Sequence, residues 1–258
     1  MDYIILDIEF NGRKFASDLP MEVIEIGAVR LNAELTVVDT FTALIKPLYF
    51  AKLNSFIKKK TGIPQAEIDS ARRFPSVADD FMSWLGQSDE RLFVTWGGED
   101  MKRIVIDTRL HNRDDGFWLA ADYYDLLKGY LRVHGLTNDV SVEAALTELG
   151  LAASGMAHRA LDDALMTADI FRKLYDQLDL DNTQRYKDQF SNAKERRLVR
   201  SAVSVMLSRK LTPEWQWVVE HFLTGKVALE NTRKMAELEA YFADEVAKKE
   251  TPQRAPLP

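Results

Sequence analysis

The feature that most constrains this sequence is a short apolar run near the N-terminus that carries two acids, Leu6-Asp7-Ile8-Glu9-Phe10. Successive side chains of a β-strand point to opposite faces, so Asp7 and Glu9 share one face and the apolar residues share the other. A strand this apolar is typical of the centre of a sheet that is covered on both sides. Two carboxylates on a covered face repel each other and are costly to bury without a cation. Divalent cations with oxygen ligands resolve that conflict, and the alternative is an edge strand whose acids face water.

Composition narrows the possible chemistry. The 258 residues are 46% apolar, which suits one domain with an appendage or two small domains. The chain has no cysteine, so disulfides, zinc–thiolate sites and cysteine nucleophiles are excluded, and any metal must bind through oxygen or imidazole. The first residues do not resemble a signal peptide, and no apolar run approaches the roughly 20 residues that cross a bilayer, so we expect a cytoplasmic protein without a membrane span. The net charge of −6 argues against strong non-specific binding to duplexes, but it leaves nucleic acid possible because bound cations reverse the field of clustered carboxylates.

Hydrophobic patterns predict a mixed α/β domain followed by helices. The first strand and the stretches Glu22–Leu31 and Thr40–Ile45 predict an antiparallel meander, and Leu92–Trp96 predicts another strand. Helices packed on this sheet are predicted near residues 76–85, 99–110, 124–133, 141–149 and 160–178. Strand signals stop after about residue 180, where long helical patterns begin. We therefore expect an α/β domain over 1–180, a helical region of unknown role over 181–250 and a disordered tail over 251–258.

A second group of polar residues lies in the segment Ala157–Ala164, just before and within a predicted helix. In a helix that begins near Ala160, Asp163 lies on a largely apolar stripe, whereas Asp162 heads a mostly polar row. Asp163 is therefore the better candidate to face a site. His158 precedes the helix, and histidine changes protonation near neutral pH, which suits a general base. The alternative is a histidine at the surface or one hydrogen-bonded in the core.

A third group is Trp96-Gly97-Gly98-Glu99-Asp100, in which a strand ends, two glycines turn the chain and acids enter the first turn of a helix. The helix dipole favours acids there without any function. Periodicity does not choose between Glu99 and Asp100.

Taken together, the patterns D-x-E, W-G-x-x-D and H-x-A-x-x-D, in that order, resemble the DEDDh 3′–5′ exonuclease superfamily, whose members have an RNase H-like fold. The resemblance extends from Tyr3 to about Leu178, and Thr61-Gly62-Ile63 and the run Ser141–Leu146 agree with it. Within the superfamily the chain is most similar to the ERI-1-like branch, which includes the bacterial sporulation-inhibitor KapD type. The resemblance implies an RNase H-like mixed β-sheet flanked by helices, here with a C-terminal helical appendage.

The resemblance also implies roles for individual residues. Asp7, Glu9, Asp100 and Asp163 match the metal ligands, and His158 matches the general base. Two Mg²⁺ or Mn²⁺ ions, about 3.5–4 Å apart, would hold the scissile phosphate. The residues expected to contact the substrate are Phe10, Asn11, Thr61, Gly62, Ile63 and Trp96.

Two departures from the family pattern concern the substrate. Asn11 stands where the family often has threonine, and Lys58-Lys59-Lys60 replaces a histidine that usually precedes T-G-I. The asparagine puts the preferred sugar in question. The lysines either contact phosphate or form a solvated loop.

The expected activity is removal of nucleoside 5′-monophosphates from free 3′ ends of single-stranded RNA or DNA, with RNA favoured. The rival hypotheses are a regulatory module that has lost turnover and a proofreading or accessory subunit. Basic residues between 194 and 200 either contact nucleic acid or form a solvated helix face. An apolar stripe between 215 and 222 predicts a helical core or the seam of a homodimer.

Overall fold

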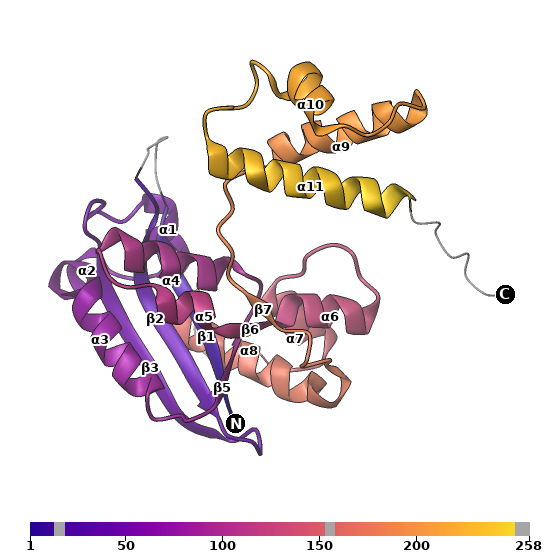
Figure 1. The fold of residues 1–258 in the computed structure, drawn as a ribbon. Helices are drawn as coiled ribbons and strands as arrows, with labels where there is room; N and C mark the ends of the chain where they lie inside the picture. The colour runs from indigo at the N-terminus through magenta and orange to yellow at the C-terminus, as the bar shows by residue number, and fades with distance from the viewer. Residues whose placement is uncertain (13–18, 153–157, 251–258) are drawn as a thin grey trace. The chain divides into compact units, whose positions relative to one another are not determined.

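The computed structural model describes residues 1–12, 19–152 and 158–250. It separates into two compact units, Met1–Tyr186 and Lys187–Pro258 (Figure 1). No helix in the described part of the chain combines the length and the apolar character that a membrane crossing requires.

The first unit is built on a seven-stranded sheet with the order β4-β3-β2-β1-β5-β6-β7. The meander is confirmed, because β1 pairs antiparallel with β2, and β2 pairs antiparallel with β3. On its other side β1 pairs in parallel with β5, so the strand that carries Asp7 and Glu9 is internal to the sheet, as predicted. The strands are β1 (Asp2–Asn11), β2 (Glu22–Leu31), β3 (Val37–Lys46), β4 (Arg72–Arg73), β5 (Arg91–Thr95), β6 (Asp122–Asp125) and β7 (Gln184–Arg185).

Helices cover both faces of this sheet and form two separate apolar cores. Ile4, Leu6 and Ile8 of β1 belong to the core formed with α3 (Phe74–Leu85), α4 (Glu99–Leu110) and α5 (Gly116–Ala120). Tyr3 and Ile5 belong to the opposite core, formed with α6 (Leu126–His134), α7 (Val142–Glu148) and α8 (Ala160–Leu174). Because side chains alternate along a strand, Asp7 and Glu9 continue the face of Tyr3 and Ile5, which α7 and α8 cover.

The prediction of one helix near 124–133 is wrong at its start. Asp122–Asp125 forms β6, which pairs in parallel with β5 and antiparallel with β7, and α6 begins only at Leu126. The mostly apolar run Tyr123–Leu127 is compatible with the hydrophobic pattern of a strand and with that of a helix. Its strand conformation therefore depends on pairing with strands that are distant in sequence. Two further differences concern the end of the unit. Helix α8 ends at Leu174 and is followed by a 3₁₀ turn, and β7 forms after residue 180, where no strand was predicted.

The second unit is helical and has its own core. It contains α9 (Ala193–Ser208), α10 (Trp215–Val218), a π-helical turn at Val219–Leu223 and α11 (Thr232–Glu250). A capping box between Asn192 and Glu195 begins α9. The apolar stripe between 215 and 222 contributes to this core: Val218 is fully buried, and Trp215, Val219 and Phe222 pack around it.

Candidate active site

Strand β1 carries the first two acids to the end of the strand. Asp7 is paired with Gly27 of β2, and Glu9 with Glu25. The register of β1 against β2 then shifts between Glu9 and Phe10, which marks a bulge at the point where the strand leaves the core. Glu9 is only 6% exposed.

The start of α8 lies directly on β2 beside these acids. A Cβ added to Gly27 would lie 2.2 Å from the carbonyl carbon of Ala160 and from the backbone nitrogen of Leu161. Glycine is therefore required, because it lets the helix backbone touch the sheet next to Asp7. The buried Glu25 carboxylate accepts hydrogen bonds from Arg159 Nε (3.1 Å) and Nη2 (2.8 Å) and from the backbone N–H of Ala160 (3.1 Å). This fixes the first turn of α8 in place.

That first turn brings Asp163 and His158 to the acids of β1. One ligand atom each of Glu9, His158 and Asp163 lie within 4.8 Å of one another. The backbone N–H of His158 donates to Asp163 Oδ1 at 3.3 Å. His158 has a φ of 68°, a left-handed conformation that residues other than glycine rarely adopt. Asp163 thus stabilises the left-handed backbone conformation of His158.

Asp100 reaches the same site from the edge of β1 that pairs with β5, opposite the edge that pairs with β2. It lies in the first turn of α4, after Gly97 and Gly98 turn the chain at the end of β5. Asp100 Oδ1 accepts the backbone N–H of Ile8, between the two acids of β1, at 3.1 Å. Glu99, by contrast, is half exposed and pairs with Lys102 and Arg103. The structure therefore places Asp100, and not Glu99, beside the acids of β1, which periodicity alone did not decide.

The four carboxylates lie in surroundings that oppose their ionisation. Burial raises the pKa of Asp7 well above its usual value, and the charges of Asp100, Asp163 and Glu9 raise it further. Burial likewise raises the pKa of Glu9 to about 7 and that of Asp100 to about 7. It also raises the pKa of Asp163, against the opposing hydrogen bond from the N–H of His158. Clustered, buried oxygen ligands of this kind fit hard divalent cations, which would restore the charged form of each acid.

Of the residues predicted to contact the substrate, Phe10 and Asn11 directly follow Glu9 on β1, and several members of the set have structural partners. The Asn11 amide donates to Phe50 O (3.0 Å) and Lys52 O (3.1 Å), and its oxygen accepts the N–H of Asn54 (2.9 Å). Asn11 therefore ties the loop before α1 to the end of β1.

The T-G-I motif ends α1 (Ser55–Thr61). Thr61 Oγ1 donates to Ile57 O and accepts the N–H of Ile63, Gly62 adopts a φ of 68°, and Ile63 is fully buried.

The two predicted aromatic contacts also have partners within the protein. Trp96 Nε1 donates to Val140 O at 2.8 Å. The guanidinium of Arg103 lies 4.6 Å from the centre of the Phe10 ring. Both aromatic side chains remain partly exposed.

Comparison with known proteins identifies the family. A family model described as an exonuclease, RNase_T, matches residues 4–171, which include all four acids and His158. The chain belongs to this exonuclease family. It is a 3′–5′ exonuclease of the DEDDh type, with the mixed sheet of RNase H-like nucleases.

Similar proteins agree with this assignment. The probable 3′-5′ exonuclease KapD of Bacillus subtilis is 31% identical over 175 residues, which cover 66% of this chain and 82% of KapD. The 3′-5′ exoribonuclease 1 of Mus musculus is 30% identical over 179 residues, which cover 66% of this chain but only 52% of the murine protein. Among solved structures, the nuclease domain of 3′hExo, a DEDDh family member bound to rAMP, superposes with a TM-score of 0.63 at 25% identity, covering 68% of this chain and 92% of that one.

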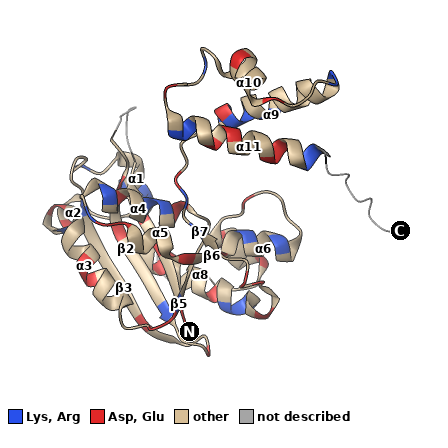
Figure 2. Ribbon diagram, viewed as in Figure 1, with Lys and Arg blue, Asp and Glu red and all other residues tan. Residues whose placement is uncertain are grey.

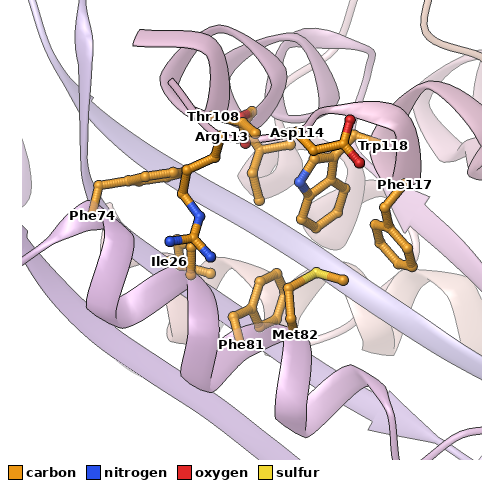
Figure 3. A pocket seen from close by; sticks show the side chains of 11 residues that line it. Ile26, Phe74, Phe81, Met82, Thr108, Arg113, Asp114, Phe117 and Trp118 are labelled. Carbon is orange, nitrogen blue, oxygen red and sulfur yellow. The ribbon is translucent and has the colours of Figure 1, made fainter. Parts of the chain in front are cut away.

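A pocket on the opposite face of the sheet is separate from the acid cluster. It has a volume of about 230 Å³ and opens between α3, α4 and α5, with Ile26 of β2 at its floor (Figure 3). Its lining is mainly apolar and aromatic, with Arg113 and Asp114 as the charged members. None of the four acids lines it, so it belongs to the core formed by α3, α4 and α5.

Sequence reasoning missed several residues that shape the candidate site. Glu25 and Arg159 hold the start of α8, and Gly27 lets it approach. An acid inside the fully buried strand Glu22–Leu31 was the signal that could have revealed Glu25, since such a group needs a partner.

Glu143 of α7 is a further acid near the cluster. Its burial opposes ionisation, but hydrogen bonds with its own backbone and with Ser141, and the charges of His158 and Lys60, lower its pKa below the usual value. No motif in the sequence pointed to it or to Lys60 as a neighbour of the acids.

Proposed function

We propose that this exonuclease uses divalent cations, two Mg²⁺ or Mn²⁺ ions, to release nucleoside 5′-monophosphates from 3′ ends of single-stranded RNA in preference to DNA. The observation that carries the proposal is the convergence of Asp7, Glu9, Asp100 and Asp163 from β1, α4 and α8 on one site, with His158 at its edge. The name of the murine relative, an exoribonuclease, and the rAMP bound to 3′hExo support RNA as the substrate class.

The four carboxylates would hold the cations, and His158 would act on water. When bound, such cations stabilise the negative charge that develops on the phosphate and on the departing 3′ oxygen. The side chain of His158 accepts the proton of a water whose oxygen bonds to the terminal phosphorus. The bond from phosphorus to the 3′ oxygen of the preceding nucleotide breaks, and that oxygen takes a proton from solvent. The products are a nucleoside 5′-monophosphate and a strand shortened by one residue with a free 3′ hydroxyl.

The proposal predicts that RNA is shortened from its 3′ end faster than DNA of the same sequence, and only when a divalent cation is present. The test uses 5′-labelled RNA and DNA single strands with Mg²⁺, with Mn²⁺ or with excess EDTA, resolved on sequencing gels. Chromatography of the released mononucleotides identifies the product. Digestion that persists in EDTA would refute the cation requirement, nucleoside 3′-monophosphates would refute the mechanism, and faster digestion of DNA would refute the substrate preference.

Replacement of His158 by alanine should lower turnover by about 10²- to 10⁴-fold and change cation affinity little, because a general base acts on water and not on the metal. Single-turnover rates on the labelled RNA measure the first effect, and calorimetric titration of the metal-free protein with Mn²⁺ measures the second. His134→Ala is the matched control, since this exposed histidine of α6 contacts only the Tyr130 ring among the interactions seen in the described residues. Loss of Mn²⁺ binding together with turnover would instead assign His158 as a ligand, which its position near Glu9 and Asp163 allows.

A further inference from the structure

Helix α1 packs at the end of β1 that carries Glu9. Its first turn is tied to the end of β1 through the hydrogen bond from Asn54 N–H to Asn11 Oδ1, two residues beyond Glu9. Ile57 is buried against this end of the strand. At the other end, the N–H of Gly62 donates to Lys58 O at 3.1 Å, and Thr61 is buried. The helix is thus tied to β1 at its start and anchored by the buried Ile57 and Thr61, so the directions of its side chains follow from helix geometry.

The last turn of α1 is basic and carries Lys58, Lys59 and Lys60 (Figure 2, Lys and Arg in blue). At about 100° per residue, Lys60 lies about 60° around the helix from the buried Ile57, whereas Lys59 lies about 160° away from it. Lys60 therefore stands beside the face that packs toward β1, and Lys59 points away. All three are exposed to solvent.

The positive charge of Lys60 lowers the pKa of four carboxylates that come from three elements. They are Asp7 and Glu9 of β1, Glu143 of α7 and Asp163 of α8. Lys60 nevertheless forms none of the ion pairs found within the part of the chain that the structure describes. Its ammonium group is therefore near the acids, solvent-accessible and not committed to any one of them.

We propose that Lys60 is a built-in counter-cation of the active site, which offsets the carboxylate charge in the metal-free protein and binds a phosphate oxygen of the substrate when divalent cations are bound. The inference rests on the proposed cation-dependent function. Before metal binds, the ammonium lowers the repulsion among the acids. Once Asp7, Glu9 and Asp163 are occupied by cations, the same flexible side chain can turn from them to a negatively charged phosphate of the incoming strand. Lys60 would thereby weaken metal binding and strengthen substrate binding.

These opposite effects give the inference a specific test. In Lys60→Gln, we expect Mn²⁺ to bind the full-length metal-free protein roughly three- to tenfold more tightly in calorimetric titrations, because a nearby positive charge is gone. At saturating Mn²⁺, we expect KM for single-stranded RNA to rise about three- to tenfold, with little change in kcat, because binding and not the chemical step loses an interaction. Lys60→Arg should restore both values toward those of the unmodified protein.

The matched control is Lys59→Gln, which removes the same charge from the same turn but on the side that faces away from the acids. It should leave Mn²⁺ affinity and KM within about twofold of the unmodified protein. If Lys60→Gln and Lys59→Gln have the same Mn²⁺ affinity, the role of Lys60 is refuted while the proposed function stands. If the unmodified protein binds no Mn²⁺, the cation-dependent function fails and the inference fails with it.

Discussion

Replacing Asp163 by asparagine is expected to reduce 3′-end digestion by about a thousandfold or more, while the same replacement at Asp162 leaves the rate within about twofold. The two acids are adjacent on α8 and differ in what they face. Asp163 is 9% exposed and lies with Glu9 and His158, whereas Asp162 is partly exposed and acts on Arg159. Asparagine keeps the shape of aspartate but cannot supply a carboxylate, so the comparison isolates charge at one position.

Initial rates on 5′-labelled RNA at several Mn²⁺ concentrations provide the measurement. Thermal melting in EDTA shows whether each variant is folded, and Asp163→Asn should melt no lower than the unmodified protein, because it removes one of several repelling carboxylates. Asp7→Asn should behave as Asp163→Asn does. Near-normal digestion by Asp163→Asn, or an equal loss in Asp162→Asn, would contradict the assigned role.

The sequence carried enough information to position two of the three site segments. Alternation along the first strand put Asp7 and Glu9 on one face, and the helical stripe favoured Asp163 over Asp162. Both placements follow from the side-chain repeat of a single strand or helix, so they require no knowledge of its neighbours. Asp100 could not be chosen over Glu99 in this way, because the deciding contact is with the backbone of Ile8, which lies 92 residues earlier in the chain.

Contacts between distant elements explain what sequence reasoning missed. The strand β6 depends on pairing with β5 and β7, so a local pattern assigned its residues to a helix. The position of Lys60 near the acids depends on how α1 is tied to β1, whereas the sequence suggested either a contact with phosphate or a solvated loop. The pairing of Glu25 with Arg159 joins residues 134 positions apart. Local periodicity contains no information about such partners.

Substitution of Gly27 by alanine should affect both stability and catalysis, although Gly27 bears no functional group. The added Cβ would meet the carbonyl carbon and oxygen of Ala160 and the nitrogen of Leu161 at 2.2–2.5 Å. These are backbone atoms, so no side-chain rotation relieves the overlap, and α8 must move away from β2. We expect the free energy of unfolding to fall by about 1–3 kcal/mol. The same movement carries Asp163 and His158 away from Asp7, and a displacement near 1 Å can reduce the rate by about a hundredfold.

Gly86→Ala provides the matched control for this loss. Gly86 follows α3 with a φ of −62°, and a Cβ there would meet only Met82 O and Ser83 O at 3.4 Å, so alanine should be tolerated. Urea unfolding gives the stability of each variant, and single-turnover digestion of RNA at saturating Mn²⁺ gives the rate. The two effects are separated by measuring the rate at a temperature at which Gly27→Ala is folded, where we expect digestion to remain slow. If Gly27→Ala matched the unmodified protein in both rate and stability, the close contact of α8 with β2 could not be what sets the distance between Asp163 and Asp7.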